Sequence, residues 1–275
     1  MIKKLSNKIY FTFLPLCLVI LLSISCSSDN KDPTILFTSL KANKEFVFTE
    51  DPIVLSIDGT GYTTISVTST NPAISITKAT STSYEIKSTV ATTAYIYVEL
   101  TNNANKEFKY ITLNFYEHGV KDYTTVEGIK VNYDGSAKVL ALLGEPDKKL
   151  DSSTGTLEYW NYGSKGLNLT IIKSSSVVES ISILSSNFIY TNSSNVQTNY
   201  TNYPYEIGNS WKINNSSTTM DMIVSKLGLP TIKGTSTTSL TLRYYQYSTQ
   251  KLIFRFYSDS EDNYTGKKII NFVVY

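Results

Sequence analysis

The sequence predicts a protein that is mainly β with an α+β part: a β-sandwich comes first, and two similar units, each with one helix and an antiparallel sheet, follow it. Apolar and polar residues alternate with a period of two between residues 33 and 117, which is the pattern of half-buried strands. After residue 118 the chain repeats itself, and each copy opens with a helical pattern. The 21 tyrosines and the 17% of charged residues suit sheets with polar outer faces.

The first 25 residues have the features of an export signal and are excluded from the fold. A basic start precedes an apolar run over 9–22, which is shorter than the roughly 20 residues of a membrane-spanning helix. Small residues lead to Cys26, and a polar stretch completes a tether over 26–32. This arrangement resembles the lipobox of bacterial lipoproteins, with Ile24 as a mild departure. An ordinary secretory peptide is the alternative.

The lipobox resemblance implies cleavage before Cys26 and a triacylated anchor, of the palmitate type, on that residue. Several lipid chains hold a protein to a membrane durably. The resemblance therefore implies a location on the bacterial outer membrane, and leaves open whether the protein faces the periplasm or the cell surface. Because Cys17 leaves with the signal, we expect no disulfide and no thiolate metal site in the mature chain.

The formal net charge of +2 comes from the export signal. Three of the 25 basic residues lie in that segment, which leaves 22 against 23 acidic residues and a net charge of −1 for the mature chain. Proteins that bind nucleic acids carry a basic face. The composition therefore predicts no nucleic-acid partner, and no motif indicates a cofactor.

Residues 33–117 are expected to form the sandwich, because turn residues at 58–59, 71–72 and 101–103 separate its short strands. Several short strands at this spacing are typical of the immunoglobulin type. The phrase Ser-Thr-Asn-Pro-Ala-Ile at 69–74 resembles a turn and strand of bacterial immunoglobulin-like domains. The apolar residues that alternate include Ile53, Leu55, Ile57, Ile65, Val67, Ile74, Ile76, Ala94, Ile96, Val98, Leu100, Ile111, Leu113 and Phe115.

Two copies of one motif occupy 118–190 and 197–275. Residues 156–172 align on 241–257 without a gap, and Leu-Gly-x-Pro occurs at 143–146 and again at 227–230. Identical residues in the aligned stretches are Thr156, Leu157, Tyr159, Tyr162 and Leu167, matched by Thr241, Leu242, Tyr244, Tyr247 and Leu252.

Each copy is expected to start with a short helix. Ser136 or Asp134 caps the first helix and Thr218 or Thr219 the second. Each helix ends at a glycine, Gly144 or Gly228, where a positive φ is needed, and a proline stops its continuation. The expected strands are 157–162, 167–172 and 178–184 in the first copy, and 240–247, 252–257 and 269–275 in the second.

A helix, Leu-Gly-x-Pro, an aromatic-rich strand and two more strands resemble the repeat shared by β-lactamase-inhibitor-protein-like domains and the small lipoprotein of the outer-membrane barrel assembly machinery. The resemblance covers about 155 residues. Tandem copies are most similar to the inhibitor-protein arrangement, in which two sheets form one concave surface, whereas the lipid anchor is more similar to the assembly lipoprotein.

Catalytic and metal-binding patterns are weak, so we expect a protein that is not an enzyme. His118 is the single histidine, beside Gly119 at the expected domain junction, and is interpreted as a linker residue because no second histidine or cysteine joins it. Glu145 and Asp147 flank a proline and are expected to be solvated charges. The acidic stretch 259–263 departs from a calcium loop and is expected to be a polar hairpin loop.

Aromatic residues on two matched strands give the one positive indication of function. Alternation places Trp160 and Tyr162 on one face of the first strand, and Arg243, Tyr245 and Tyr247 on the same face of the second. We expect this face to be the exposed one and to bind a partner, because rigid aromatics with polar tips suit binding patches. The leading hypothesis is an envelope protein or peptide partner, with the sandwich as a spacer. A glycan is the alternative partner.

Overall fold

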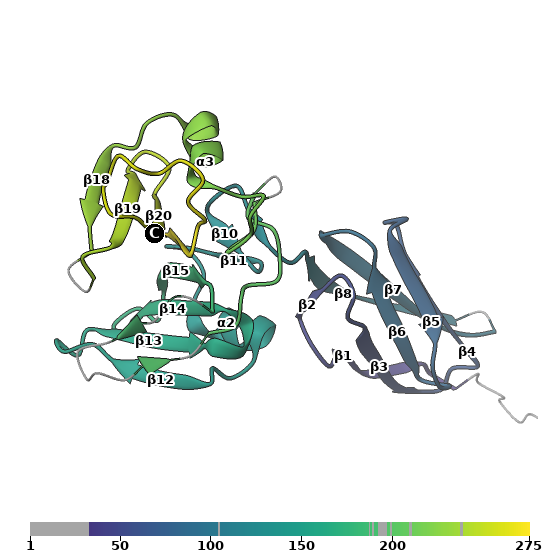
Figure 1. Cartoon of the computed structure of the whole chain (residues 1–275). Helices are drawn as coiled ribbons and strands as arrows, with labels where there is room; N and C mark the ends of the chain where they lie inside the picture. Colours follow the sequence, from purple (N-terminus) through teal and green to yellow (C-terminus); the bar gives the residue numbers. More distant parts are fainter. Residues whose placement is uncertain are drawn as a thin grey trace, which may run out of the picture.

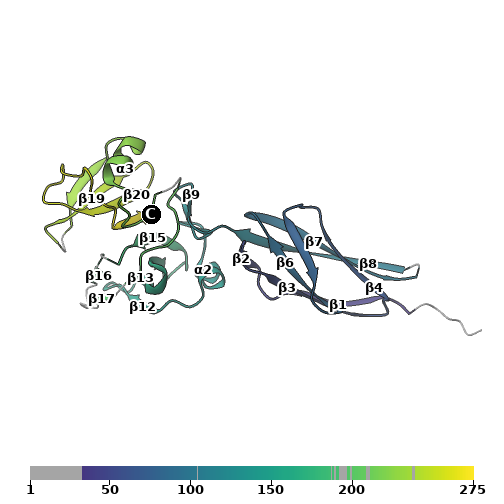
Figure 2. The same ribbon diagram turned by 45° about the vertical axis from the view of Figure 1, so that its right-hand side comes forward.

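The computed structural model describes residues 33–275, except 104, 187, 189, 192–196, 199, 209–210 and 237–238. The chain is mainly β, as the sequence predicts. Figure 1 shows two bodies, a sandwich built by residues up to β8 and a second body that holds all the later elements. Figure 2 shows the sandwich projecting away from the second body, with the first described residues toward its far end. Cys26 and the predicted export signal lie outside the described residues.

The first body consists of two four-stranded sheets. One has the order β1-β3-β6-β5 and the other the order β2-β8-β7-β4. All neighbours are antiparallel except β2 and β8, which run parallel. The strands are β1 (Leu36–Ala42), β2 (Phe46–Phe48), β3 (Ile53–Thr60), β4 (Thr64–Ser69), β5 (Ile74–Lys78), β6 (Ser83–Ser88), β7 (Thr92–Asn102) and β8 (Asn105–Tyr116).

Alternating residues of the two sheets fill the core between them. On β3, Ile53, Leu55 and Ile57 are buried while the residues between them are exposed. On β7 the buried set is continued by Ala94, Ile96, Val98 and Leu100. This alternation is the one that the sequence predicts, and it leaves the odd-numbered residues of β7 on the outer face of their sheet.

The second body is organised around one eight-stranded sheet of order β12-β13-β14-β15-β21-β20-β19-β18. A small three-stranded sheet links it to the sandwich. Its elements are β9 (Val120–Lys121), β10 (Thr125–Val126), β11 (Ile129–Lys130), α2 (Ser136–Leu143), β12 (Lys148–Asp151), β13 (Leu157–Tyr162), η1 (Gly163–Lys165), β14 (Leu167–Ile172), β15 (Val178–Leu184), β16 (Tyr190–Thr191), β17 (Gln197–Thr198), α3 (Met220–Leu227), β18 (Ile232–Thr235), β19 (Leu242–Tyr247), β20 (Leu252–Tyr257) and β21 (Asn271–Val274).

The order of this sheet is the same read outward from its centre in either direction. Strands β15 and β21 pair antiparallel at the centre, with Ile181 opposite Val274 and Ile183 opposite Phe272. From that pair outward, β14, β13 and β12 are matched by β20, β19 and β18. The edge strands β12 and β18 are additions to the expected strands, and the observed second-copy strands start two residues later than expected, at Leu242 and Asn271.

Equivalent backbone contacts recur in the two halves of the sheet. Asn132 has φ 59° and its N–H donates to Val178 O at 2.8 Å, and Asn214 has φ 52° and its N–H donates to Ile269 O at 2.8 Å. The helices end as predicted, because Gly144 has φ 76° and Gly228 has φ 82°. These two glycines have ψ near 180°, a region that is open essentially to glycine alone.

The start of the first helix differs from the prediction. Gly135 occupies the cap position of α2, with extended backbone and no side-chain capping bond. Asp134 is occupied elsewhere, because its carboxylate accepts from the Lys130 N–H at 2.6 Å and from Lys138 Nζ at 2.9 Å. Thr219 does stand at the cap of α3, although its side chain makes no capping hydrogen bond there.

Candidate functional site

The predicted partner-binding aromatics are buried, so the expectation that their face is exposed is wrong. The exposed fractions are 4% for Trp160, 1% for Tyr162, 0% for Tyr245 and 2% for Tyr247. All four belong to the large core that also contains Val139 and Leu143 of α2 and Met220 and Ile223 of α3. The face chosen from the sequence is therefore the one that packs on the helices.

Two of these tyrosines hold the helix ends. The Tyr162 hydroxyl donates to Gly144 O at 2.9 Å, and the Tyr247 hydroxyl donates to Gly228 O at 3.1 Å. The carbonyls at a helix C-terminus lack intrahelical partners, so each hydroxyl satisfies a group that burial would otherwise leave unpaired. Tyr162 in the first half and Tyr247 in the second therefore play the same part, since each bonds the end of its helix to a strand of the sheet.

The remaining predicted site residue, Arg243, is also committed to structure. Its guanidinium donates to Ser258 O at 3.2 Å, to Asp259 O at 2.6 Å and to the Thr235 hydroxyl. These contacts fasten the 258–263 loop to the edge of the sheet. Within that loop Asp259 accepts from Asn263 Nδ2 at 2.8 Å, and the hydrogen bond lowers the pKa of the Asp259 carboxyl. The loop is the polar connection that the sequence predicts.

The opposite face of the eight-stranded sheet carries repeated aromatics that lie outside the large core. Tyr159 and Tyr244 lie on that face, at the two positions that match in the repeat, and both are half-buried. The described residues place both helices on the other side, in the core with Trp160 and Tyr245. We call the following half-buried or exposed residues the helix-free face: Tyr159, Thr170, Ser180, Tyr244, Gln246, Arg255 and Tyr257.

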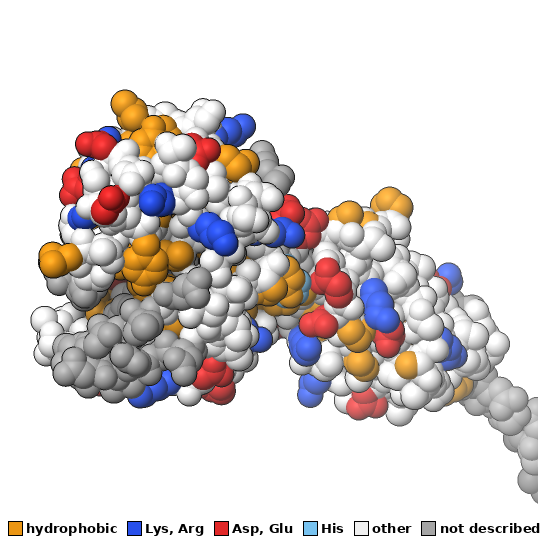
Figure 3. All heavy atoms as spheres, viewed as in Figure 1, with side chains coloured by type: hydrophobic (Ala, Val, Ile, Leu, Met, Phe, Trp, Pro, Cys, Tyr) orange, Lys and Arg blue, Asp and Glu red, His pale blue; other side chains and the backbone are white. Residues whose placement is uncertain are grey.

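A connecting segment covers one part of this side of the sheet. The Tyr200 hydroxyl donates to Asn161 Oδ1 at 2.5 Å, and Asn168 Nδ2 donates to the same hydroxyl at 3.3 Å. Tyr200 also joins a small apolar cluster, with Leu184, Phe188, Leu242 and Ile270. Phe188 and Tyr200 thus bound the helix-free face on one side. Figure 3 shows hydrophobic side chains exposed between the upper and lower parts of this body.

The junction of the two bodies contains a stack of three rings. His118 lies between Phe48 of β2 and Tyr205, with ring centroids at 3.8 Å and 4.1 Å. The His118 and Tyr205 rings are nearly parallel, at 3°. Phe48 belongs to the core of the second body although its strand belongs to the sandwich. The rings therefore tie the sandwich to the second body.

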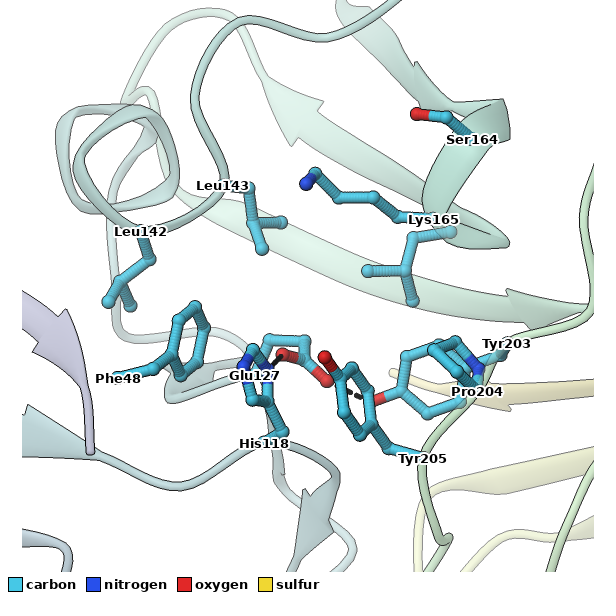
Figure 4. A pocket seen from close by; sticks show the side chains of 11 residues that line it. Phe48, His118, Glu127, Leu142, Leu143, Ser164, Lys165, Tyr203, Pro204 and Tyr205 are labelled. Atoms are coloured by element: carbon cyan, nitrogen blue, oxygen red, sulfur yellow. Dashed lines mark hydrogen bonds and ion pairs between the residues drawn. The ribbon is translucent and has the colours of Figure 1, made fainter. Parts of the chain in front are cut away.

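A buried carboxylate organises this stack (Figure 4). Glu127 is 2% exposed and accepts from the Gly119 N–H at 3.0 Å, from the Tyr203 hydroxyl and from His118 Nδ1. Three donors to one carboxylate compensate for its burial. Burial and the adjacent Glu127 raise the pKa of Tyr203 well above its ordinary value, so this phenol stays a donor. Glu127 itself has φ 51° and precedes Gly128 at φ 71°.

A pocket of about 230 Å³ adjoins the stack. Figure 4 shows Lys165 and Ser164 on the far side of it from His118 and Tyr205. The Ser164 hydroxyl donates to Asp147 at 3.2 Å rather than to the histidine. In the described part of the chain, no group of three or more His, Cys, Asp or Glu side chains is arranged to hold a metal ion. The pocket and the ring stack thus lie together at the junction of the two bodies.

The interpretation of His118 as a linker residue is only half right. His118 does lie at the junction, but its ring is packed on both faces and bonded to Glu127. The sequence contains a weak signal for this cluster, the Glu-Gly pair at 127–128 just after the single histidine. The identity of the third partner, Tyr203, depends on chain 76 residues away and carries no local signal.

The comparisons with known proteins leave function to this geometry. No family model matches the chain, and no curated protein matches it. An extracellular protein containing an SCP domain from Bacillus anthracis str. Ames is similar in structure, with a TM-score of 0.31 and 13% identity. The alignment covers 57% of this chain and 47% of that one, so this chain spans about half the length of the other protein. Among the described helices, none is long and apolar enough to cross a membrane.

Proposed function

We propose that the protein is a lipid-anchored envelope protein that is not an enzyme, and that it binds a protein or peptide partner through the helix-free face. Cys26 carries the lipid, in the bacterial outer membrane. Residues 33–117 form an immunoglobulin-like sandwich, and 118–190 and 197–275 are tandem copies of one α+β unit. The partner meets the side of the sheet opposite to the helices, in place of the buried face that carries Trp160 and Tyr245.

The observation that carries this proposal is the pair Tyr159 and Tyr244. The two residues match in the repeat, yet neither belongs to the core cluster that the repeated Tyr162 and Tyr247 complete. A tyrosine on a sheet surface offers a rigid apolar body and a polar tip, which suits recognition. On the same face Thr170 lies opposite Tyr159 and Arg255 lies opposite Tyr244. The Arg255 guanidinium also donates to Asn271, and Gln246 Nε2 donates to the Tyr275 hydroxyl at 2.9 Å, so these polar groups are held in place around the tyrosines.

The sheet orders support the domain assignments. The orders β1-β3-β6-β5 and β2-β8-β7-β4 correspond to the two sheets of an immunoglobulin-type sandwich. The mirrored order of the eight-stranded sheet, with equivalent bonds at Asn132 and Asn214, supports the tandem repeat. A continuous sheet shared by two copies gives a wider surface than one copy alone.

A glycan is the alternative ligand, since aromatic faces next to amide and guanidinium groups also suit sugars. A glycan site depends on one or two rings, whereas a protein site extends over a larger contiguous patch. Loss of binding in a single Tyr244→Ala variant with full binding in Tyr159→Ala favours a glycan, and graded losses in both favour a protein.

The anchor is tested by metabolic labelling with a palmitate analogue and by membrane fractionation. We expect label on the wild-type chain in the outer-membrane fraction, and neither label nor membrane retention in Cys26→Ser. Label that persists in Cys26→Ser contradicts the assignment of Cys26 as the lipidated residue.

The binding face is tested with a photo-crosslinking amino acid placed at Tyr159 or at Tyr244 in the producing cells. Met222, an exposed residue of α3 on the opposite side, is the matched control position. We expect one defined adduct from both tyrosine positions and none from Met222. Equal adducts from all three positions, or none from the two tyrosines, contradict a partner on the helix-free face.

A further inference from the structure

The sandwich carries an exposed aromatic patch of its own, on the outer face of β7 and β8. Tyr95 and Tyr97 project from β7, at 49% and 40% exposed, and Phe108 and Tyr110 from β8, at 62% and 64%. Tyr110 lies opposite Tyr97 and contacts both β7 tyrosines, at centroid distances of 6.1 Å and 6.2 Å. Large contiguous apolar surface is uncommon on a soluble face and marks an interaction site.

The patch lies close to the point where the chain enters the sandwich. Asn102 Nδ2 at the tip of the β7–β8 hairpin donates to Pro33 O at 3.2 Å, so the chain enters the sandwich beside that tip. Pro33 lies seven positions after Cys26, a reach of at most about 25 Å. At about 3.4 Å per strand residue, the patch begins about 10 Å and ends about 24 Å from the tip.

The chemistry of the patch fits a lipid interface. Both phenylalanine and tyrosine have an apolar ring, and tyrosine adds a polar hydroxyl at its tip. Aromatic side chains with a polar tip are enriched at the headgroup level of membranes. The nearest charged residues on the same face are Glu99 and Lys106, which form an ion pair at 3.0 Å. Their opposite charges cancel, so they add no net charge beside the patch. The threonines Thr68 and Thr112 flank the tyrosines across the strands.

We infer that the β7–β8 aromatic patch rests on the bilayer surface to which Cys26 is anchored, so that the sandwich leans on the membrane instead of standing upright as a simple spacer. This inference rests on the proposed anchor at Cys26. The anchor keeps the patch within reach of the lipid, and the patch then fixes how the sandwich is turned about its tether. A second copy of this chain or a glycan is the competing occupant.

The test uses the mature chain from Cys26, with its single thiol coupled to a maleimide phospholipid in vesicles of phosphatidylethanolamine and phosphatidylglycerol. This coupling supplies the anchor chemically, so the result does not depend on whether cells lipidate Cys26. Tyr110→Trp reports from the patch. Leu36→Trp is the matched control: Leu36 is 61% exposed, only three residues from Pro33, and lies on β1 of the other sheet. Emission from Trp160 and Trp211 is subtracted with the unsubstituted chain.

With brominated acyl chains in the vesicles, we expect blue-shifted and quenched added emission from Tyr110→Trp, and unshifted, unquenched emission from Leu36→Trp. Quenching of both variants to the same extent means proximity without a preferred face and overturns the inference. No quenching of Tyr110→Trp also overturns it, and a vesicle-independent blue shift that grows with protein concentration assigns the patch to a second copy. Failure of palmitate labelling at Cys26 in cells bears on the proposed anchor alone.

Discussion

In both halves of the eight-stranded sheet a tyrosine hydroxyl donates to the glycine carbonyl at the end of the helix. The halves differ in the contacts that each helix makes with segments outside its own helix-and-sheet unit. In the first half α2 lies against β2 of the sandwich, and Lys138 Nζ sits 4.5 Å from the Tyr116 ring centroid. In the second half, Asp221 at the start of α3 accepts from the Gly266 N–H at 2.8 Å. The comparison teaches that the repeated residues build the unit, whereas residues that do not repeat adapt each unit to its neighbours.

The largest expected effect on stability comes from removing the shared tyrosines. Tyr162→Ala and Tyr247→Ala each delete a buried ring and leave the carbonyl of Gly144 or Gly228 without its donor. We expect each variant to lose about 3 to 5 kcal/mol of unfolding free energy, measured by urea denaturation. A matched control is Tyr133→Ala, which removes an exposed ring and is expected to change stability by less than about 0.5 kcal/mol. A large loss in one half alone breaks the equivalence.

Alkaline pH tests the same hydroxyls without removing the rings. Burial raises the pKa of Tyr247 to about 12, above the ordinary value near 10. Stability from a raised pKa is complete below pH 10 and is lost as the pH rises toward 12, by about 2 to 3 kcal/mol for this group. The unfolding midpoint followed by tyrosinate absorbance is expected to move to higher pH in Tyr247→Phe. An unchanged midpoint contradicts control by this phenol.

The pKa of Tyr162 depends on nearby carboxylates, whereas the pKa of Tyr247 does not. Burial, and then the carboxylates of Glu145 and Asp147, raise the pKa of Tyr162, whereas burial and Tyr264 raise that of Tyr247. Replacing both acids in Glu145→Gln/Asp147→Asn lowers the pKa of Tyr162 and is expected to leave that of Tyr247 unchanged. An equal change in the pKa values of Tyr162 and Tyr247 would show that the two acids do not act on Tyr162 specifically.

Gly144→Ala and Gly228→Ala test the helix ends. The space around both glycines is open, with no atom within 4 Å of an added Cβ, so the cost is conformational. We expect a loss of about 1 to 3 kcal/mol in each variant. Gly135→Ala is the control, because Gly135 has φ −98° and a Cβ there meets its nearest neighbour at an ordinary 3.5 Å. A control as destabilised as the two variants breaks the backbone argument.

The smallest expected effect concerns one lysine on each edge strand. Lys149 of β12 lies 4.3 Å from the Trp160 ring, and Lys233 of β18 lies 5.6 Å from the Tyr245 ring. Cation–π contacts of exposed lysines contribute about 0.5 to 1 kcal/mol, most with tryptophan. We expect Lys149→Met to lose more stability than Lys233→Met in thermal unfolding. The reverse order shows that the ion pairs of these lysines with Glu145 and Asp262 dominate instead.

The sequence predicted the strands and helices well where the pattern is long. The period of two located β13, β14 and β15, and Gly144 and Gly228 marked both helix ends. Strands β12 and β18 were not predicted, because neither Lys148-Lys149-Leu150-Asp151 nor Ile232-Lys233-Gly234-Thr235 alternates apolar with polar residues. Charged residues on such edge strands limit pairing with further strands. Alternation alone separates two faces without saying which one meets a helix.

The candidate site was predicted less well for that same reason. A tyrosine hydroxyl that reaches a helix carbonyl, as at Tyr162, has the same sequence pattern as one that reaches water. Tyr159 was identified as a repeated residue but assigned to the packed side. The His118–Glu127–Tyr203 joint is assembled from separate stretches of the chain, so it appears only after folding.

The pairing of β21 with β15 has a consequence for how the protein folds. Ile181 and Val274 are brought together from positions about ninety residues apart, and contacts of such sequence separation form slowly. Until β21 docks, β15 is an edge with unpaired backbone groups, open to pairing with another chain. Its late closure makes the interval before β21 docks the most aggregation-prone period of folding, and a holding chaperone is expected to act on the β15 edge.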